Sequence, residues 1–89
     1  MPEREAHTRK LILRLRRVEG QIRGIQAMME KGDACDQIAQ QLAAARRALD
    51  KAFHEMVACN LQMEIAASQT PDDVISATEH MTHLLSKYG

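Results

Sequence analysis

Apolar residues recur along the N-terminal third of the chain at alternating spacings of four and three residues. The series is Leu11, Leu15, Val18, Ile22, Ile25 and Met29. This heptad pattern is typical of an amphipathic helix that packs against another helix. Gly32 then stands where a residue just beyond a helix end is expected, and Asp33 is placed to cap the next helix. We predict a helix over about 9–31, preceded by a flexible tail at 1–8.

The same alternation continues through the middle of the chain without a break. Its members are Ile38, Leu42, Ala45, Leu49, Ala52, Met56, Cys59, Met63 and Ala66. A helix from about 34 to 67 would be roughly 50 Å long at about 1.5 Å per residue, whereas a compact domain of this size has a radius of gyration of about 12–13 Å. The helix must therefore extend beyond its own subunit, and its apolar stripe needs a partner chain. We expect a homo-oligomer.

A third helix is predicted over about 71–87. Thr70 is its cap, Pro71 occupies the first helical position and Asp73 completes a capping pattern. Its apolar positions are Val74, Ala77, Met81, Leu84 and Tyr88. The predicted fold class is all-α: a three-helix protomer with one long central helix, forming a single domain over 1–89.

Charge is distributed unevenly although the formal net charge is zero. Residues 1–31 hold eight Lys or Arg against four acids, so this part sums to +4 and the remainder to −4. The asymmetry indicates an anionic partner for one face, although solvated helix surfaces often look similar. With no signal peptide and no apolar run near the roughly 18 residues of a membrane span, we expect a cytoplasmic protein with reduced cysteines and no membrane partner.

Three segments together resemble the CsoR/RcnR/FrmR family of bacterial repressors. They are Arg-Leu-Arg-Arg-Val-Glu-Gly-Gln-Ile at 14–22, Gly-Asp-Ala-Cys at 32–35 and Ile-Ala-Gln-Gln-Leu-Ala-Ala-Ala-Arg at 38–46. The resemblance covers nearly the whole chain. It implies a disc-like tetramer made of two dimers, a DNA-binding surface that is not a helix-turn-helix, and release of double-stranded operator DNA when a small reactive inducer binds at Cys35.

The resemblance also implies that Cys35 of one subunit faces positions 60 and 64 of its partner. Copper sensors of the family carry His and Cys there, nickel and cobalt sensors His and His, formaldehyde sensors His and Glu, and persulfide sensors a Cys at the second position. Here the residues are Asn60 and Glu64. Asn is a poor ligand for soft or borderline metals, so the set is closest to the formaldehyde-sensing subgroup, with Asn in place of His.

Pro2 strengthens the aldehyde hypothesis. Removal of Met1 would leave Pro2 with a free secondary amine, which forms an iminium with formaldehyde, and a thiolate can add to that iminium to close a one-carbon bridge. The helix N-terminus favours the thiolate form of Cys35. By resemblance, Pro2 and Cys35 form the bridge, while Asn60 and Glu64 orient or activate them.

Other functions remain open at this point. Cys35 with Cys59 would suit a persulfide sensor, although Cys59 lies on the apolar stripe and reads more simply as a packing residue. No cofactor is required; a transition-metal sensor would use Cys35, Glu64 and His7. His80 and His83 are either a metal pair or a solvated helix edge. Outside these classes stands a coiled-coil interaction module without DNA binding. An enzyme is not expected, because no acid–base pair, triad or phosphate loop is found.

A surface that contacts DNA phosphates is predicted from basic residues on the first two helices. They are Arg9, Lys10, Arg14, Arg16, Arg17, Arg46 and Arg47. Repeated in an oligomer, these side chains would form a broad basic face. The alternative is ordinary helix solvation, with Arg46 or Arg47 paired to Asp50.

Overall fold

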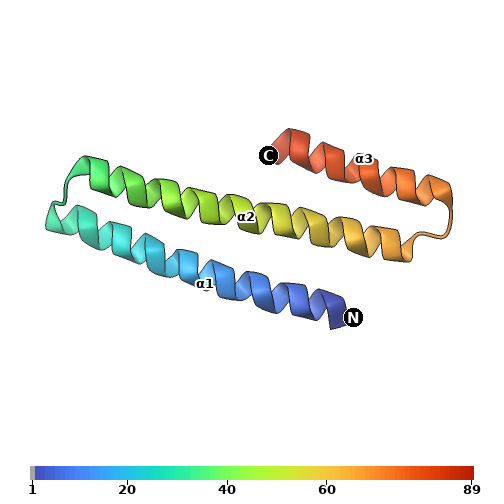
Figure 1. The fold of residues 1–89 in the computed structure, drawn as a ribbon, viewed down its shortest axis with the longest axis horizontal. Coiled ribbons are helices and arrows are strands. Elements are labelled where there is room, and N and C mark those ends of the chain that lie inside the picture. Colours follow the sequence, from blue (N-terminus) through green and yellow to red (C-terminus); the bar gives the residue numbers. More distant parts are fainter. Residues whose placement is uncertain (1) are drawn as a thin grey trace.

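The computed structural model describes residues 2–89, with side chains from residue 4 onward. It contains three helices, α1 (Pro2–Lys31), α2 (Cys35–Ala67) and α3 (Pro71–Tyr88), and no strand within the described residues. The predicted all-α class with a long central helix is confirmed. Figure 1 shows α1 and α3 running antiparallel to α2, one along each side of it. Within this part of the chain, no helix is both long and apolar enough to cross a membrane.

The N-terminal segment differs from the prediction, because α1 begins at Pro2 and the expected tail is helical from there on. Pro is favoured at the first helical position, where its missing N–H has no partner to lose. Arg4, Glu5 and Ala6 follow it as helix-favouring residues. The side chain of Pro2 lies outside the described residues.

A tight turn at Gly32 reverses the chain between α1 and α2. Gly32 has a φ of 80°, and its N–H donates to the Met29 carbonyl while the Asp33 N–H donates to the Met28 carbonyl. These two bonds form a Schellman motif, which requires the left-handed backbone that Gly adopts without strain. The predicted Asp33 cap is wrong: the N-cap of α2 is Ala34, without a side-chain hydrogen bond, and Asp33 lies near Lys31 instead.

The interface between α1 and α2 is built from residues seven positions apart. Its buried residues are Leu11, Val18 and Ile25 on α1 and Ala45, Ala52 and Cys59 on α2. Large side chains on α1 thus meet small ones on α2, so the two helices approach closely along their length. No polar or charged residue is buried among the described side chains.

The three helices form a single flat layer. The extents are 58 × 28 × 12 Å and the radius of gyration is 17.5 Å, against about 12 Å for a compact domain of this length. A layer one helix thick leaves large apolar side chains uncovered. Those spaced by sevens are Leu15, Ile22 and Met29 on α1 and Leu42, Leu49 and Met56 on α2, which we call the hairpin stripe.

The start of α3 follows the predicted cap. Thr70 accepts a hydrogen bond from the Asp73 N–H at 3.2 Å, and the Asp73 carboxylate accepts from the Thr70 and Gln69 N–H groups. The backbone hydrogen bond from Gln69, with those from Thr70, lowers the pKa of Asp73 below its ordinary value of 3.8. The capping box therefore contributes its full stability above about pH 3.8. It loses this stability as the pH falls through the lowered pKa of Asp73, because the protonated carboxyl is a weaker acceptor.

Replacing Thr70 with alanine is expected to lower the free energy of unfolding by about 1 kcal/mol, the usual cost of a lost N-cap. Urea unfolding followed by circular dichroism at one fixed protein concentration measures the change. Thr78→Ala is the matched control, because the Thr78 hydroxyl bonds only within its own helix, to Val74. Equal losses in the two variants would contradict the capping argument.

Candidate functional site

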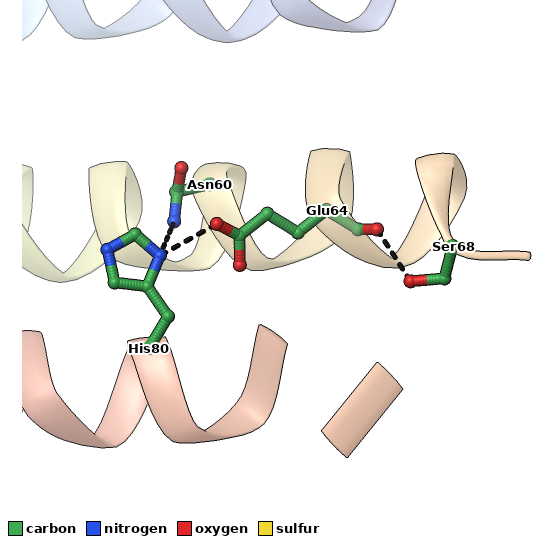
Figure 2. Close-up of polar contacts among 4 residues, drawn as sticks. All are labelled: Asn60, Glu64, Ser68 and His80. Atoms are coloured by element: carbon green, nitrogen blue, oxygen red, sulfur yellow. Dashed lines mark hydrogen bonds and ion pairs between the residues drawn. The ribbon is translucent and has the colours of Figure 1, made fainter. Parts of the chain in front are cut away.

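Three polar side chains meet between the C-terminal part of α2 and the middle of α3. The His80 Nδ1 atom lies 2.7 Å from Glu64 Oε1 and 3.4 Å from Asn60 Nδ2 (Figure 2). Asn60 and Glu64 are one turn apart on α2 and therefore share a face. The predicted pair of positions 60 and 64 thus has a third member, contributed by α3.

The short contact to Glu64 determines which nitrogen of the His80 ring carries the hydrogen. A carboxylate only accepts hydrogen bonds, so at 2.7 Å Nδ1 carries the hydrogen and donates it. In the neutral ring, Nε2 then keeps its lone pair and can act as a base or a ligand. Sequence reasoning treated His80 as half of a pair with His83 and missed this contact, because a separation of 16 residues across a turn carries no local periodicity.

Glu64 lies in the last turn of α2, which two hydrogen bonds from Ser68 close. The Ser68 hydroxyl donates to the Glu64 carbonyl at 2.8 Å, and the Ser68 N–H donates to the Ile65 carbonyl, so the last turn is closed. A hollow beside it is lined by Glu64, Ala67, Ser68, Asp73, Ser76 and Ala77. The second carboxylate oxygen, Oε2, is shielded from solvent and has no hydrogen-bond partner within the described residues.

Cys35 is the first residue of α2 and is exposed. Asn60 lies 25 residues further along the same helix, about 37 Å away at 1.5 Å per residue. One protomer therefore does not bring Cys35 to Asn60 and Glu64. These residues can share a site only if a second copy supplies the cysteine.

Cys59 is buried in the interface between α1 and α2. It continues the seven-residue series of Ala45 and Ala52, so its thiol packs against α1. Cys35 and Cys59 are about 36 Å apart along α2. The structure gives Cys59 the surroundings of a packing residue.

The described part of one protomer does not assemble a transition-metal site. Among the described residues, no three His, Cys, Asp or Glu side chains are grouped closely enough to hold a metal ion. Glu64 and His80 supply two donors, whereas closed sites for such metals use about four. His7 is half-buried and lines a hollow with Lys10, Leu11, Glu55, Ala58 and Gln62, far from Cys35 of the same protomer.

The predicted basic residues fall into two groups. Arg14 is half-buried and donates to Glu55 Oε1 at 2.7 Å, so it joins α1 to α2 rather than reaching outward. The exposed members are Arg9, Lys10, Arg16, Arg17, Arg46 and Arg47.

Sequence reasoning also missed Arg23, which is exposed. Arg9, Arg16 and Arg23 each stand two residues before a buried residue of α1 and are seven residues apart. At about 100° per residue, they form one row on the side of α1 that faces away from α2. The seven-residue spacing was the signal that could have found the row.

Residues 7–87 match the family described as metal-sensitive transcriptional repressor. The chain belongs to this family. The family and the two structural neighbours below are transcriptional regulators rather than enzymes.

Two solved structures are similar to this chain in both sequence and fold. A variant of the Formaldehyde-Responsive Regulator FrmR from Salmonella enterica serovar Typhimurium is 30% identical, with a TM-score of 0.76 over 94% of this chain and 96% of that one. The nickel-responsive transcriptional regulator InrS is 26% identical, with a TM-score of 0.77 over 91% of each chain. An uncharacterized protein in the bioA 5′ region of Serratia marcescens is 28% identical over 81 residues, 90% of this chain and 89% of its own length. Regulators that respond to different inducers therefore share this three-helix fold.

Proposed function

We propose that the chain is a DNA-binding repressor, active as a homo-oligomer, that releases operator DNA when formaldehyde reacts at Pro2 and the partner subunit's Cys35. Assembly of two or more copies would bring the reacting groups together, the groups would react with formaldehyde, and the reaction would change the DNA-binding surface. Each of these steps is supported by a different feature of the fold.

The hairpin stripe supports the assembly. Leu42 and Met56 lie seven residues to either side of Leu49, so two copies of α2 can pack antiparallel with Leu49 against Leu49 and Leu42 against Met56. The partners' α1 residues of the stripe then complete a four-helix core. Two such dimers would form the tetramer that the family resemblance implies.

The same register completes the inducer site. Cys35 stands fourteen residues before Leu49, and Met63 stands fourteen after it. Antiparallel pairing about Leu49 therefore brings the partner subunit's Cys35 to the level of Met63, between Asn60 and Glu64. This coincidence between an apolar stripe and a set of polar residues is the observation that carries the proposal.

The start of α1 supports the choice of formaldehyde. α1 begins at Pro2 and runs alongside the C-terminal half of α2, since His7 and Gln62 line one hollow (Figure 1). The Pro2 amine therefore belongs to the same end of the hairpin as Glu64. The amine adds to formaldehyde and loses water to give an iminium; the thiolate then forms the C–S bond, leaving an N–CH₂–S bridge and one water.

Rival inducers have less support. Within the described residues, one protomer groups no three side chains that could hold a metal ion, and Asn60 adds no good donor for a soft or borderline metal. A sulfur sensor would need a second accessible thiol, and Cys59 is buried. One relative responds to formaldehyde and another to nickel, as their names state, so the residues of the site decide between them.

Formation of the N–CH₂–S bridge would change DNA binding by acting on α1. Joining the first residue of α1 to the partner's α2 fixes the position of that helix, which carries the row of Arg9, Arg16 and Arg23. The modified assembly then disfavours the DNA-competent arrangement by the difference in free energy between the two shapes.

Intact mass and DNA binding test this function together. We expect a small excess of formaldehyde to add one carbon atom per chain to the protein lacking Met1, and to release DNA selected from a random pool. Cys35→Ala is expected to abolish both effects, while Cys59→Ala retains them because Cys59 only packs against α1. An adduct or DNA release that persists in Cys35→Ala would sink the formaldehyde mechanism.

A further inference from the structure

The contact between Glu64 and His80 has the form in which proteins prepare an imidazole for chemistry. A carboxylate that accepts the hydrogen of one ring nitrogen fixes the tautomer and the ring orientation. Here Nδ1 is bound to Glu64 at 2.7 Å. In Figure 2 the second ring nitrogen, Nε2, points away from Glu64 along α2, in the direction of the N-terminal part of that helix.

The position of this pair coincides with the proposed inducer site. His80 contacts both Asn60 and Glu64, and the register about Leu49 brings the partner subunit's Cys35 to the level of Met63, within about one helical turn of both residues. Asn60 has no basic nitrogen, so it cannot accept a proton at the site. His80 supplies, from α3, the imidazole that position 60 lacks.

We infer that His80 accepts the thiol proton of the partner subunit's Cys35, with Glu64 holding the ring in place and balancing its charge. The S–H bond breaks, Nε2 gains the proton and the sulfur keeps the electron pair as thiolate. During loss of water from the Pro2 adduct, the same proton passes to the departing oxygen, which restores neutral His80. The inference rests on the proposed assembly and names the base of the inducer site.

A purely structural role makes a different prediction. A half-exposed hydrogen bond between α2 and α3 contributes little to stability, and its loss would change unfolding without changing thiol reactivity. The two roles are therefore separated by measuring the chemistry of Cys35 directly.

The test compares His80→Ala and His80→Asn with His83→Ala, a matched control one turn further along α3. Two rates are measured at one fixed pH by mass spectrometry: alkylation of Cys35 by iodoacetamide, and formation of the one-carbon formaldehyde adduct. Melting temperature is recorded for every variant. An unassisted thiol with a pKa of about 8.5 is about 3% thiolate at pH 7, and the thiolate is the reacting form. Both His80 variants are therefore expected to slow both rates by up to about thirtyfold at that pH.

The two substitutions and a rescue distinguish a base from a structural contact. Asn at position 80 can still donate a hydrogen bond to Glu64 but cannot act as a base, so His80→Asn should retain the parent melting temperature and still react slowly. Added imidazole is expected to restore the rates of His80→Ala, and His83→Ala should react as the parent protein does.

The outcomes separate this inference from the identity of the inducer. Alkylation of Cys35 at the parent rate in both His80 variants overturns the role of His80, even if the formaldehyde adduct forms. Alkylation that depends on His80, in a protein that forms no adduct, supports the base and rejects formaldehyde as the inducer.

Discussion

Replacement of Leu49 by aspartate is expected to convert the assembly to monomers. Leu49 is 46% exposed in the single chain and lies at the centre of the hairpin stripe, where two copies would place it against itself. The variant would bury two like-charged carboxylates side by side and lose the contact between two leucines. If the free energy of dimer association becomes less favourable by about 5 kcal/mol or more, the dimer dissociation constant rises more than a thousandfold.

Sedimentation velocity over a range of protein concentrations measures this effect. Leu13→Asp is the matched control, because Leu13 is 55% exposed and lies two residues before Leu15, nearly opposite the hairpin stripe around α1. The control is expected to remain at least dimeric. If Leu49→Asp keeps the parent oligomeric state, the register about Leu49 is wrong, and Cys35 no longer meets Glu64 by this route.

The helices could be predicted from sequence because their signals are local. The heptad series and the Thr70–Asp73 cap each depend on residues within about two turns, and both are present in the structure. The start of α1 was misjudged because helix-favouring residues without an apolar stripe look like a tail. The Asp33 cap failed because the Schellman turn places Ala34, one residue later, at the helix start.

The candidate site was harder to predict because its contacts join separate helices. Cys35, Asn60 and Glu64 were named through the family resemblance, whereas the contact between Glu64 and His80 follows from how α3 lies against α2. Arg14 shows the same limit: its sequence neighbours are basic, yet its partner is Glu55 on the adjacent helix. Spacing along one helix indicates a face but not what covers that face.

Replacing Arg9, Arg16 and Arg23 together with alanine is expected to weaken DNA binding about a hundredfold at physiological salt. The three arginines are exposed in one row on the outer side of α1, so they can reach phosphates without disturbing the interface with α2. Each phosphate contact contributes roughly fivefold in affinity near 0.15 M salt through release of counterions. The loss of three contacts would lower the affinity about a hundredfold, and more if several subunits touch one duplex.

The dependence of affinity on salt identifies the reason for the loss. The slope of the logarithm of the association constant against the logarithm of salt concentration is negative, and its magnitude should decrease by about 1 for each phosphate contact removed. Lys31, Lys51 and Lys87 changed together to alanine form the matched control, since the same charge is removed away from the arginine row. If both triple variants weaken binding equally, net charge alone attracts DNA. A selective loss in the arginine variant, with the oligomer intact, would place the operator along α1, the helix that the formaldehyde bridge would hold.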